Sequence, residues 1–163
     1  MSVISTAISH HIRPLGIEDA ERVIAIDRAY ADRSRRRFFQ KRFAAARTNP
    51  DDYVHIGMVR DNLLRAFAFA RILRGEFGHQ KIIAVLDAIA VDLEEKDRGL
   101  GTALMEELTK IMRNIGVHSL QSQADWTNHH LLRFFATSGF RLAPRFALER
   151  SVHEPLDETS EEI

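Results

Sequence analysis

The sequence predicts a mixed α/β domain, of the α+β kind, in which helices flank a mostly antiparallel sheet. Up to residue 91, patterns typical of strands and helices follow one another in the order β-α-α-β-β-β. The apolar, partly β-branched run at 85–91 suits a strand buried on both faces. A loop with two glycines and an amphipathic helix from Thr102 come directly after it. At 163 residues, the chain is long enough for one domain with a proper core.

Turn-forming residues separate the elements of the first half. Asn49 and Pro50 begin a turn. Asp61 and Asn62 tolerate the left-handed conformation that a tight hairpin needs, so we expect the runs on either side of them to pair. The expected elements are a strand at 10–14, helices at 20–30 and 33–47, and strands at 53–59, 63–74 and 82–91.

The second half alternates between helices and short strands. Gly116 closes the central helix, which runs from Thr102 to about Ile115. Thr127 or Asn128 is the natural cap of the last helix. The remaining elements are a strand at 117–124, a helix at 129–138 and one or two strands within 141–150, where Pro144 limits pairing. In total we expect about four helices and a sheet of six to seven strands.

The composition excludes several classes of protein. The chain has no cysteine, which excludes disulfides, thiolate zinc sites and a catalytic thiol. Its formal net charge is zero, so whole-surface binding to nucleic acid is not expected. No apolar run approaches the roughly 18 residues of a membrane span, and the first residues lack the charged start of a signal peptide. We therefore expect a cytoplasmic protein with one domain at 1–153 and an acidic, flexible tail at 154–163.

The histidines do not form a metal-binding pattern. His10 and His11 are adjacent on an expected strand, so their side chains point to opposite faces. Asp125, His129 and His130 match no standard ligand spacing. We expect no metal.

The loop between the strand at 82–91 and the helix from Thr102 is typical of an anion site. Gly99 and Gly101 let a ligand approach the backbone, and the free N–H groups at the helix start point outward. Lys96 and Arg98 add positive charge beside them. The glycine spacing is neither that of a nucleotide-hydrolysing phosphate loop nor that of a dinucleotide fold.

The loop and a second block together resemble the GNAT superfamily of N-acetyltransferases. Lys96-x-x-Gly99-x-Gly101 is similar to the acyl-CoA signature Arg/Gln-x-x-Gly-x-Gly/Ala, with Lys96 in place of Arg or Gln. Residues 128–140 are similar to the family block N-x-x-A-x-x-F-Y-x-x-x-G-F, in which Asn128, Phe134, Gly139 and Phe140 match. The resemblance implies the GNAT fold and acetyl transfer from acetyl-CoA to a primary amine, by direct attack in a ternary complex.

The resemblance also implies where acetyl-CoA binds. The backbone of the strand end and the side chain of Asn128 would contact the pantetheine, and the loop N–H groups would contact the pyrophosphate. Lys96 or Arg98 would bind the 3′-phosphate. The implied cofactor-binding residues are Ile89, Ala90, Val91, Lys96, Asp97, Arg98, Gly99, Leu100, Gly101, Thr102 and Asn128.

Asp87 is the candidate general base, because a carboxylate in an apolar strand is costly unless it is used or paired. A structural role, with a hydrogen bond from Arg71 on the neighbouring strand, stays open beside it. Glu76, His79, His55 and Glu149 are weaker candidates for the base. Phe135 stands where the family has the tyrosine that protonates the leaving thiolate, and phenylalanine cannot donate a proton.

The acceptor is not identified by the sequence. The segment at 33–47 carries seven basic residues and no acid, and is interpreted as a solvated helix face, a surface that attracts an acidic substrate, or a contact for the acidic tail. A protein amine, a small amine and an aminoglycoside-like polycation stay open, although the basic segment disfavours the last. A non-catalytic acyl-CoA-binding or sensing domain is the alternative function, and a nucleic-acid-binding module is the least favoured. A homodimer is possible.

Overall fold

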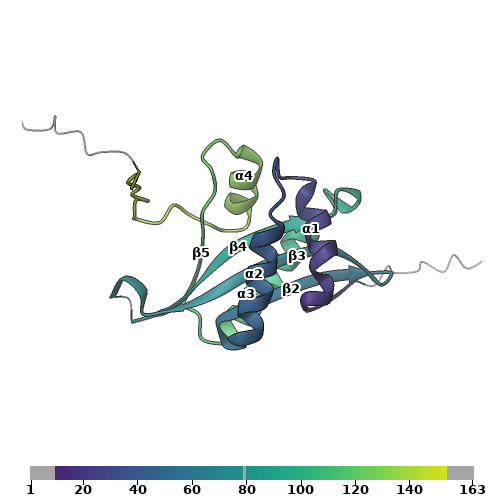
Figure 1. Ribbon diagram of the computed structural model, residues 1–163, viewed down its shortest axis with the longest axis horizontal. Coiled ribbons are helices and arrows are strands. Elements are labelled where there is room, and N and C mark those ends of the chain that lie inside the picture. Colours follow the sequence, from purple (N-terminus) through teal and green to yellow (C-terminus); the bar gives the residue numbers. More distant parts are fainter. Residues whose placement is uncertain (1–9, 79, 154–163) are drawn as a thin grey trace, which may run out of the picture.

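The computed structural model describes residues 10–78 and 80–153 and contains one five-stranded sheet in the order β1-β2-β3-β4-β5. Figure 1 shows the sheet running across the molecule. Neighbours from β1 to β4 pair antiparallel, whereas β4 and β5 pair parallel. The strands are β1 (His11–Pro14), β2 (Tyr53–Arg60), β3 (Leu63–Arg74), β4 (Ile82–Val91) and β5 (Ser119–Ser122).

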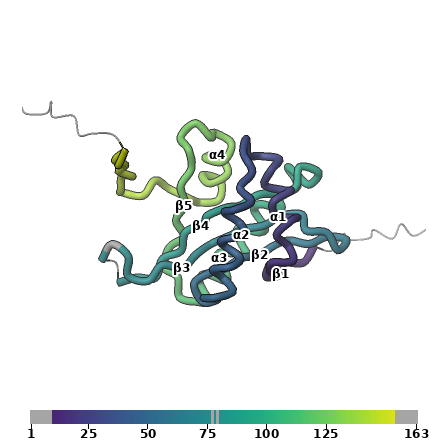
Figure 2. Tube along the Cα trace, in the orientation of Figure 1, coloured from purple at the N-terminus to yellow at the C-terminus, as the bar shows by residue number. Residues whose placement is uncertain are grey.

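Four α-helices flank this sheet. The first two pack on one face, where they bury Phe39 and Phe43 against Phe67 and Phe69 of β3. The third packs on the opposite face, and the fourth continues that layer beyond the end of β5 (Figures 1 and 2). The helices are α1 (Ala20–Arg28), α2 (Arg36–Thr48), α3 (Leu100–Asn114) and α4 (His129–Thr137), with short 3-10 turns at Ile17–Asp19, Pro50–Asp52, Glu76–Gly78 and Leu93–Glu95.

The alternation along β3 separates two cores. Phe67 and Phe69 are fully buried toward α1 and α2, and the ring of Phe39 meets both edge to face at 5.5 and 5.3 Å. Between them, Ala68 turns its small side chain to the opposite face, which leaves room for Leu104 and the rest of α3. The hairpin before β3 is confirmed, since Asp61 and Asn62 have φ of 51° and 59°.

The predicted sheet of six to seven strands is wrong in number, because the described residues form five. No strand forms within 141–150. Leu142 and Phe146 there are 99% and 94% exposed, and Pro144 between them has no N–H for a ladder. β5 is also shorter than the predicted 117–124. The predicted four helices are confirmed, but α3 begins at Leu100 instead of Thr102 because Gly99, with φ of 78°, is its N-cap.

β4 is the strand that positions the site, because it extends beyond the end of β5, its parallel neighbour. The pairing of β4 with β5 ends where Leu86 faces Ser122, while β4 continues to Val91. The predicted acidic tail at 154–163 lies outside the described residues. No helix among those residues is long and apolar enough to cross a membrane.

Candidate functional site

The end of β4 presents backbone groups that no strand covers on the β5 side. The N–H of Asp92 donates to the carbonyl of Arg65 on the β3 side at 2.7 Å. Backbone groups alternate in direction along a strand, so Ala90 also faces β3, whereas Ile89 and Val91 face the open side. The Tyr30 hydroxyl donates to the Val91 carbonyl at 2.6 Å. Of the three predicted pantetheine contacts on this strand, Ile89 therefore faces the open side of the sheet, and its carbonyl does not accept the Tyr30 bond that Val91 accepts.

The loop that follows ends in a helix N-terminus without an acceptor for its amides. Gly99 takes a left-handed φ of 78° and makes no side-chain cap, and the first turn of α3 contains no acidic residue. The first helical bond runs from the N–H of Ala103 to the carbonyl of Gly99 at 3.0 Å. The N–H groups of Leu100, Gly101 and Thr102 therefore have no acceptor within the helix, and they form the positive end of its dipole.

The two glycines of the loop do different things. A Cβ atom at Gly99 would meet nothing within 4 Å, so the space in front of this backbone is open. At Gly101, a Cβ atom would lie 3.2 Å from the Cε2 of Phe134 and 3.6 Å from the Cγ2 of Val91. Gly101 thus lets the start of α3 pack against both the end of β4 and α4.

Buried ion pairs hold the loop in shape. Glu95 is 1% exposed and contacts Arg60 at 2.5 Å, Arg65 at 3.7 Å and Arg98 at 3.4 Å. The carboxylate of Asp92 pairs with Arg65 at 3.4 Å and with Arg22. The sequence analysis did not predict this network, because a loop rich in acidic residues is typical of solvent-exposed positions.

The predicted cationic contacts lie at the surface of this loop. The Arg98 side chain is 57% exposed despite its contact with Glu95, and Lys96 is exposed. Asp97 adopts a left-handed φ of 63°. Asn128 caps α4, because its Oδ1 accepts from the N–H of Leu131 at 3.1 Å. The cap was predicted, and it occupies the oxygen of the side chain that the resemblance assigns to the pantetheine.

Asp87 lies at a β-bulge in β4. Leu86 pairs with Ala70 and Ala88 with Phe69, so Asp87 is the extra residue between two paired neighbours. Its side chain is 8% exposed. The Nε of Arg71 donates to Oδ1 at 3.0 Å, as the structural interpretation of Asp87 expected. The Nε of Arg42, from α2, lies 2.9 Å from Oδ2, a contact that sequence spacing did not indicate.

His55 is buried between Phe43 and Phe69 without a hydrogen bond. Its ring stacks on Phe69 with centroids 4.0 Å apart, and neither ring nitrogen has a partner among the described residues. Burial, and second the positive charge of Arg42, lower the pKa of His55 to about 4. The ring is therefore neutral at pH 7.

Phe135 is an apolar core residue at the position of the family's tyrosine. It is 8% exposed, and its ring centroid lies 4.8 Å from that of Phe140. Of the weaker base candidates, Glu76 and Glu149 are exposed, and His79 lies outside the described residues.

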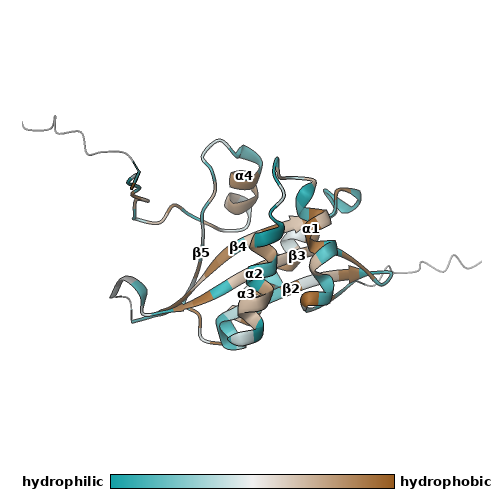
Figure 3. Ribbon diagram, in the orientation of Figure 1, coloured by the Kyte–Doolittle hydropathy of each residue, from teal (hydrophilic) through white to brown (hydrophobic). Residues whose placement is uncertain are grey.

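The basic segment is partly neutralised within the fold. Arg35 pairs with Asp27, Arg36 with Glu21, and Arg42 with Asp87. The N-terminal end of α2 is hydrophilic at the surface (Figure 3). Within the segment at 33–47, all of which the structure describes, the exposed basic residues without an ion pair are Arg33, Arg37, Lys41 and Arg47.

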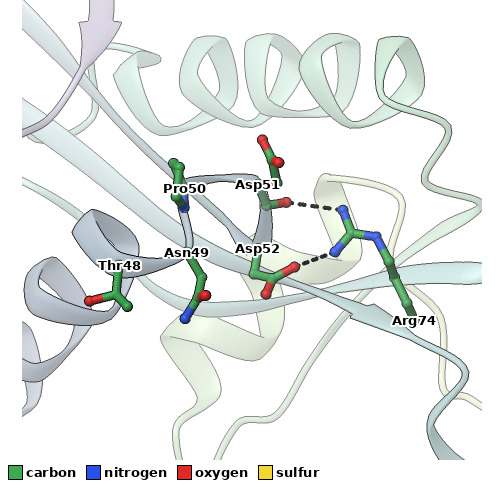
Figure 4. Close-up of a pocket in the computed structure, with 6 residues that line it drawn as sticks. All are labelled: Thr48, Asn49, Pro50, Asp51, Asp52 and Arg74. Carbon is green, nitrogen blue, oxygen red and sulfur yellow. Dashed lines mark hydrogen bonds and ion pairs between the residues drawn. The ribbon is translucent and has the colours of Figure 1, made fainter.

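A polar hollow at the other end of the sheet is not part of this site. Figure 4 shows Arg74 of β3 contacting Asp52 and the carbonyl of Asp51, the latter at 3.0 Å. Arg74 pairs with Ile82, at the far end of β4 from Val91. Among residues 10–78 and 80–153, no group of three or more His, Asp or Glu side chains could hold a metal ion.

A comparison with protein families identifies this fold and loop. Residues 17–140 match the model of the acetyltransferase (GNAT) family. The chain belongs to this family. It is therefore an N-acetyltransferase by class, and enzymes of this family use acetyl-CoA. The resemblance inferred from its two sequence blocks is confirmed.

Solved structures share the GNAT fold at low identity. Glucosamine-6-phosphate N-acetyltransferase from Arabidopsis thaliana is 17% identical with a TM-score of 0.67, over 88% of this chain and 99% of that one. The aminoglycoside 6′-N-acetyltransferase AAC(6′)-Ih from Acinetobacter baumannii is 18% identical with a TM-score of 0.72, over 88% and 98%. AAC(6′)-Iy, solved with the bisubstrate analogue CoA-S-monomethyl-acetylneamine, is 16% identical with a TM-score of 0.71, over 88% and 98%. A search of curated proteins finds no match.

Proposed function

We propose that this chain transfers the acetyl group of acetyl-CoA to a primary amine that enters between α2 and the bulge of β4. The observation that carries the proposal is the junction of β4 and α3, where uncovered strand backbone leads through the loop at 92–99 to a helix start whose first three amides have no acceptor within the helix. Such a junction fits an extended chain that ends in a pyrophosphate. The complex of AAC(6′)-Iy with a CoA-derived analogue supports this ligand class.

The residues at the junction have separate binding roles in this proposal. The amides of Leu100, Gly101 and Thr102 hold the pyrophosphate, and Lys96 or Arg98 reaches the 3′-phosphate. The backbone of Ile89 binds the pantetheine, beside Val91, whose carbonyl accepts from Tyr30. When bound, acetyl-CoA supplies an activated thioester. The protein's own part is to hold that thioester at the bulge and to exclude other nucleophiles.

Proton transfer at the bulge has two candidate arrangements. Asp87 is the only carboxylate of β4, and as a general base it would take the proton of the acceptor's ammonium group. Both of its oxygens lie at 2.9–3.0 Å from guanidinium nitrogens, which favours a role in positioning those groups. Phe135 donates no proton, but a thiolate is a fair leaving group since an ordinary thiol ionises near pH ~8.5.

The test is acetylation of an amine panel with acetyl-CoA, followed by thiol release and by mass spectrometry of the product. The proposal predicts acetyl-CoA-dependent product with at least one acceptor. Asp87→Asn distinguishes the two roles: loss of a base removes the acidic limb of the pH–rate profile, whereas loss of positioning raises KM with the limb unchanged.

A non-catalytic acyl-CoA-binding domain is the second candidate, and the burial of Phe135 among aromatic side chains favours it. Tight acetyl-CoA binding without product from any amine, in wild type and in Phe135→Tyr alike, would support this candidate over the enzyme.

A further inference from the structure

The carboxylate of Asp87 contacts the Nε atoms of two arginines, Arg42 and Arg71. Arg42 and Arg71 come from different elements, α2 and β3, and pair with the same carboxylate. Arg71 donates a hydrogen bond from its Nε to Oδ1, whereas the Nε of Arg42 lies 2.9 Å from Oδ2 as an ion pair without hydrogen-bond geometry. One negative charge therefore faces two positive charges, and the group carries a net charge of about +1. His55, whose pKa the charge of Arg42 helps to lower, is neutral and adds no charge at pH 7.

The outer nitrogens of both guanidinium groups are available. In the described part of the chain, no terminal nitrogen of Arg42 or Arg71 donates to a protein acceptor. The two side chains are 25% and 37% exposed, so a solute can reach them. Asp87 itself is 8% exposed, and the ring of Phe38 lies 5.0 Å from the Arg42 guanidinium carbon. The guanidinium groups are thus held in place from the protein side and accessible from outside.

The pair lies next to the place where the proposed reaction occurs. Asp87 is at the bulge, two residues before Ile89, which is roughly 7 Å along a strand. Its side chain faces α2, on the opposite side of β4 from α3. A small acceptor whose anionic group contacts Arg42 and Arg71 would therefore place its amine near the exposed end of β4.

We propose that Arg42 and Arg71 form a fork that binds the carboxylate or phosphate group of the acceptor, so that the substrate is an anionic amine. The inference rests on the proposed acetyltransferase function and names the substrate class. Guanidinium groups bind carboxylate and phosphate through paired hydrogen bonds, and a fixed pair of them selects such groups over neutral analogues. A polycationic amine would meet the net positive charge of the fork and the exposed Arg37 and Lys41.

Anion binding is measured first, without catalysis. Inorganic phosphate and acetate are titrated separately with CoA saturating, so that the pyrophosphate loop is occupied. The wild type is expected to bind at least one of them, and Arg71→Gln to bind at least tenfold more weakly. Arg74→Gln is the matched control, because Arg74 is on the same strand and pairs with Asp52 away from the bulge. Equal affinity in wild type and Arg71→Gln would overturn the inference.

Acceptor selectivity is measured second, with matched amines. Phosphoethanolamine is compared with ethanolamine, and β-alanine with β-alaninamide, as kcat/KM. In one of the two pairs, the kcat/KM of the anionic amine is expected to exceed that of the neutral amine at least tenfold. That pair then shows whether the acceptor's anionic group is a phosphate or a carboxylate. Arg71→Lys is expected to reduce that preference through KM. Equal turnover of neutral and anionic amines would overturn the inference but leave the transferase intact, whereas failure of the wild type to bind CoA would overturn the proposed function. In that case the anion titration is repeated in the Gly99→Glu background, where the loop amides are blocked. It still tests whether Arg42 and Arg71 bind anions.

Discussion

A buried neutral histidine makes the stability of this fold depend on pH. His55 lies between Phe43 and Phe69 with no partner for either ring nitrogen among the described residues. Burial and the charge of Arg42 lower its pKa to about 4, whereas in the unfolded chain the ordinary value of about 6.5 applies. Below pH 6.5 the unfolded chain therefore binds a proton that the folded protein does not bind until about pH 4.

The size of the effect follows from the two pKa values. The free energy of unfolding falls as the pH drops from 6.5 to 4 and levels off below that, because both states are then protonated. At about 1.4 kcal/mol for each pH unit over a window of about 2.5 units, the total loss is about 3.4 kcal/mol. Between pH 7 and pH 5 alone, the loss is about 1.8 kcal/mol.

Urea unfolding at pH 7 and pH 5 measures this loss directly. In His55→Phe, which keeps the aromatic packing and removes the titrating ring, the difference between the two pH values is expected to shrink by about 1.8 kcal/mol. His118→Gln, at an exposed position before β5, is expected to behave as wild type. A wild type and a His55→Phe variant that lose the same free energy between pH 7 and pH 5 would refute the reasoning.

Three further substitutions test the packing around the site. Glu95→Gln removes the buried carboxylate that pairs with Arg60 and is one of the counter-ions of Arg65, and it is expected to cost about 3 kcal/mol in urea unfolding. Gly101→Val pushes the start of α3 away from Phe134, so acetyl-CoA affinity should fall at least tenfold in calorimetry while the far-UV spectrum is unchanged. Phe39→Ala removes a fully buried ring and should cost about 3–5 kcal/mol, seen as a lower urea midpoint.

Local sequence patterns were enough to predict the strands and turns whose ends are marked by turn-forming residues. The bounds of β3 and β4 were predicted as observed, because apolar runs end there at turn residues such as Asp61 and Gly75. The Asp61-Asn62 hairpin followed from the tolerance of those residue types for positive φ. One or two strands were also expected within 141–150, but pairing needs a neighbouring strand, and Pro144 interrupts the N–H series there.

The candidate site was predictable where it depends on neighbours in the chain. The loop from Lys96 to Thr102 is contiguous, so its glycines could be placed at a helix start. The contact of Arg71 with Asp87 was predictable from adjacent strands. Arg42 joins Asp87 across 45 positions of sequence, and Glu95 meets Arg60 across 35, so neither pairing has a local signal. The bulge at Asp87 depends on the register with β3, which one strand alone does not define.

Calorimetric titration of acetyl-CoA into three proteins is the most direct test of the binding site at the start of α3. The wild type is compared with Gly99→Glu, which places bulk and negative charge before the free amides, and with Gly116→Glu at the other end of the same helix. Gly116 is a matched control, since both glycines have left-handed φ, 78° and 82°, and open space around the Cβ position. We expect micromolar binding by the wild type and by Gly116→Glu, and none by Gly99→Glu. Wild-type protein that does not bind, or equal binding by both variants, would contradict the proposed site.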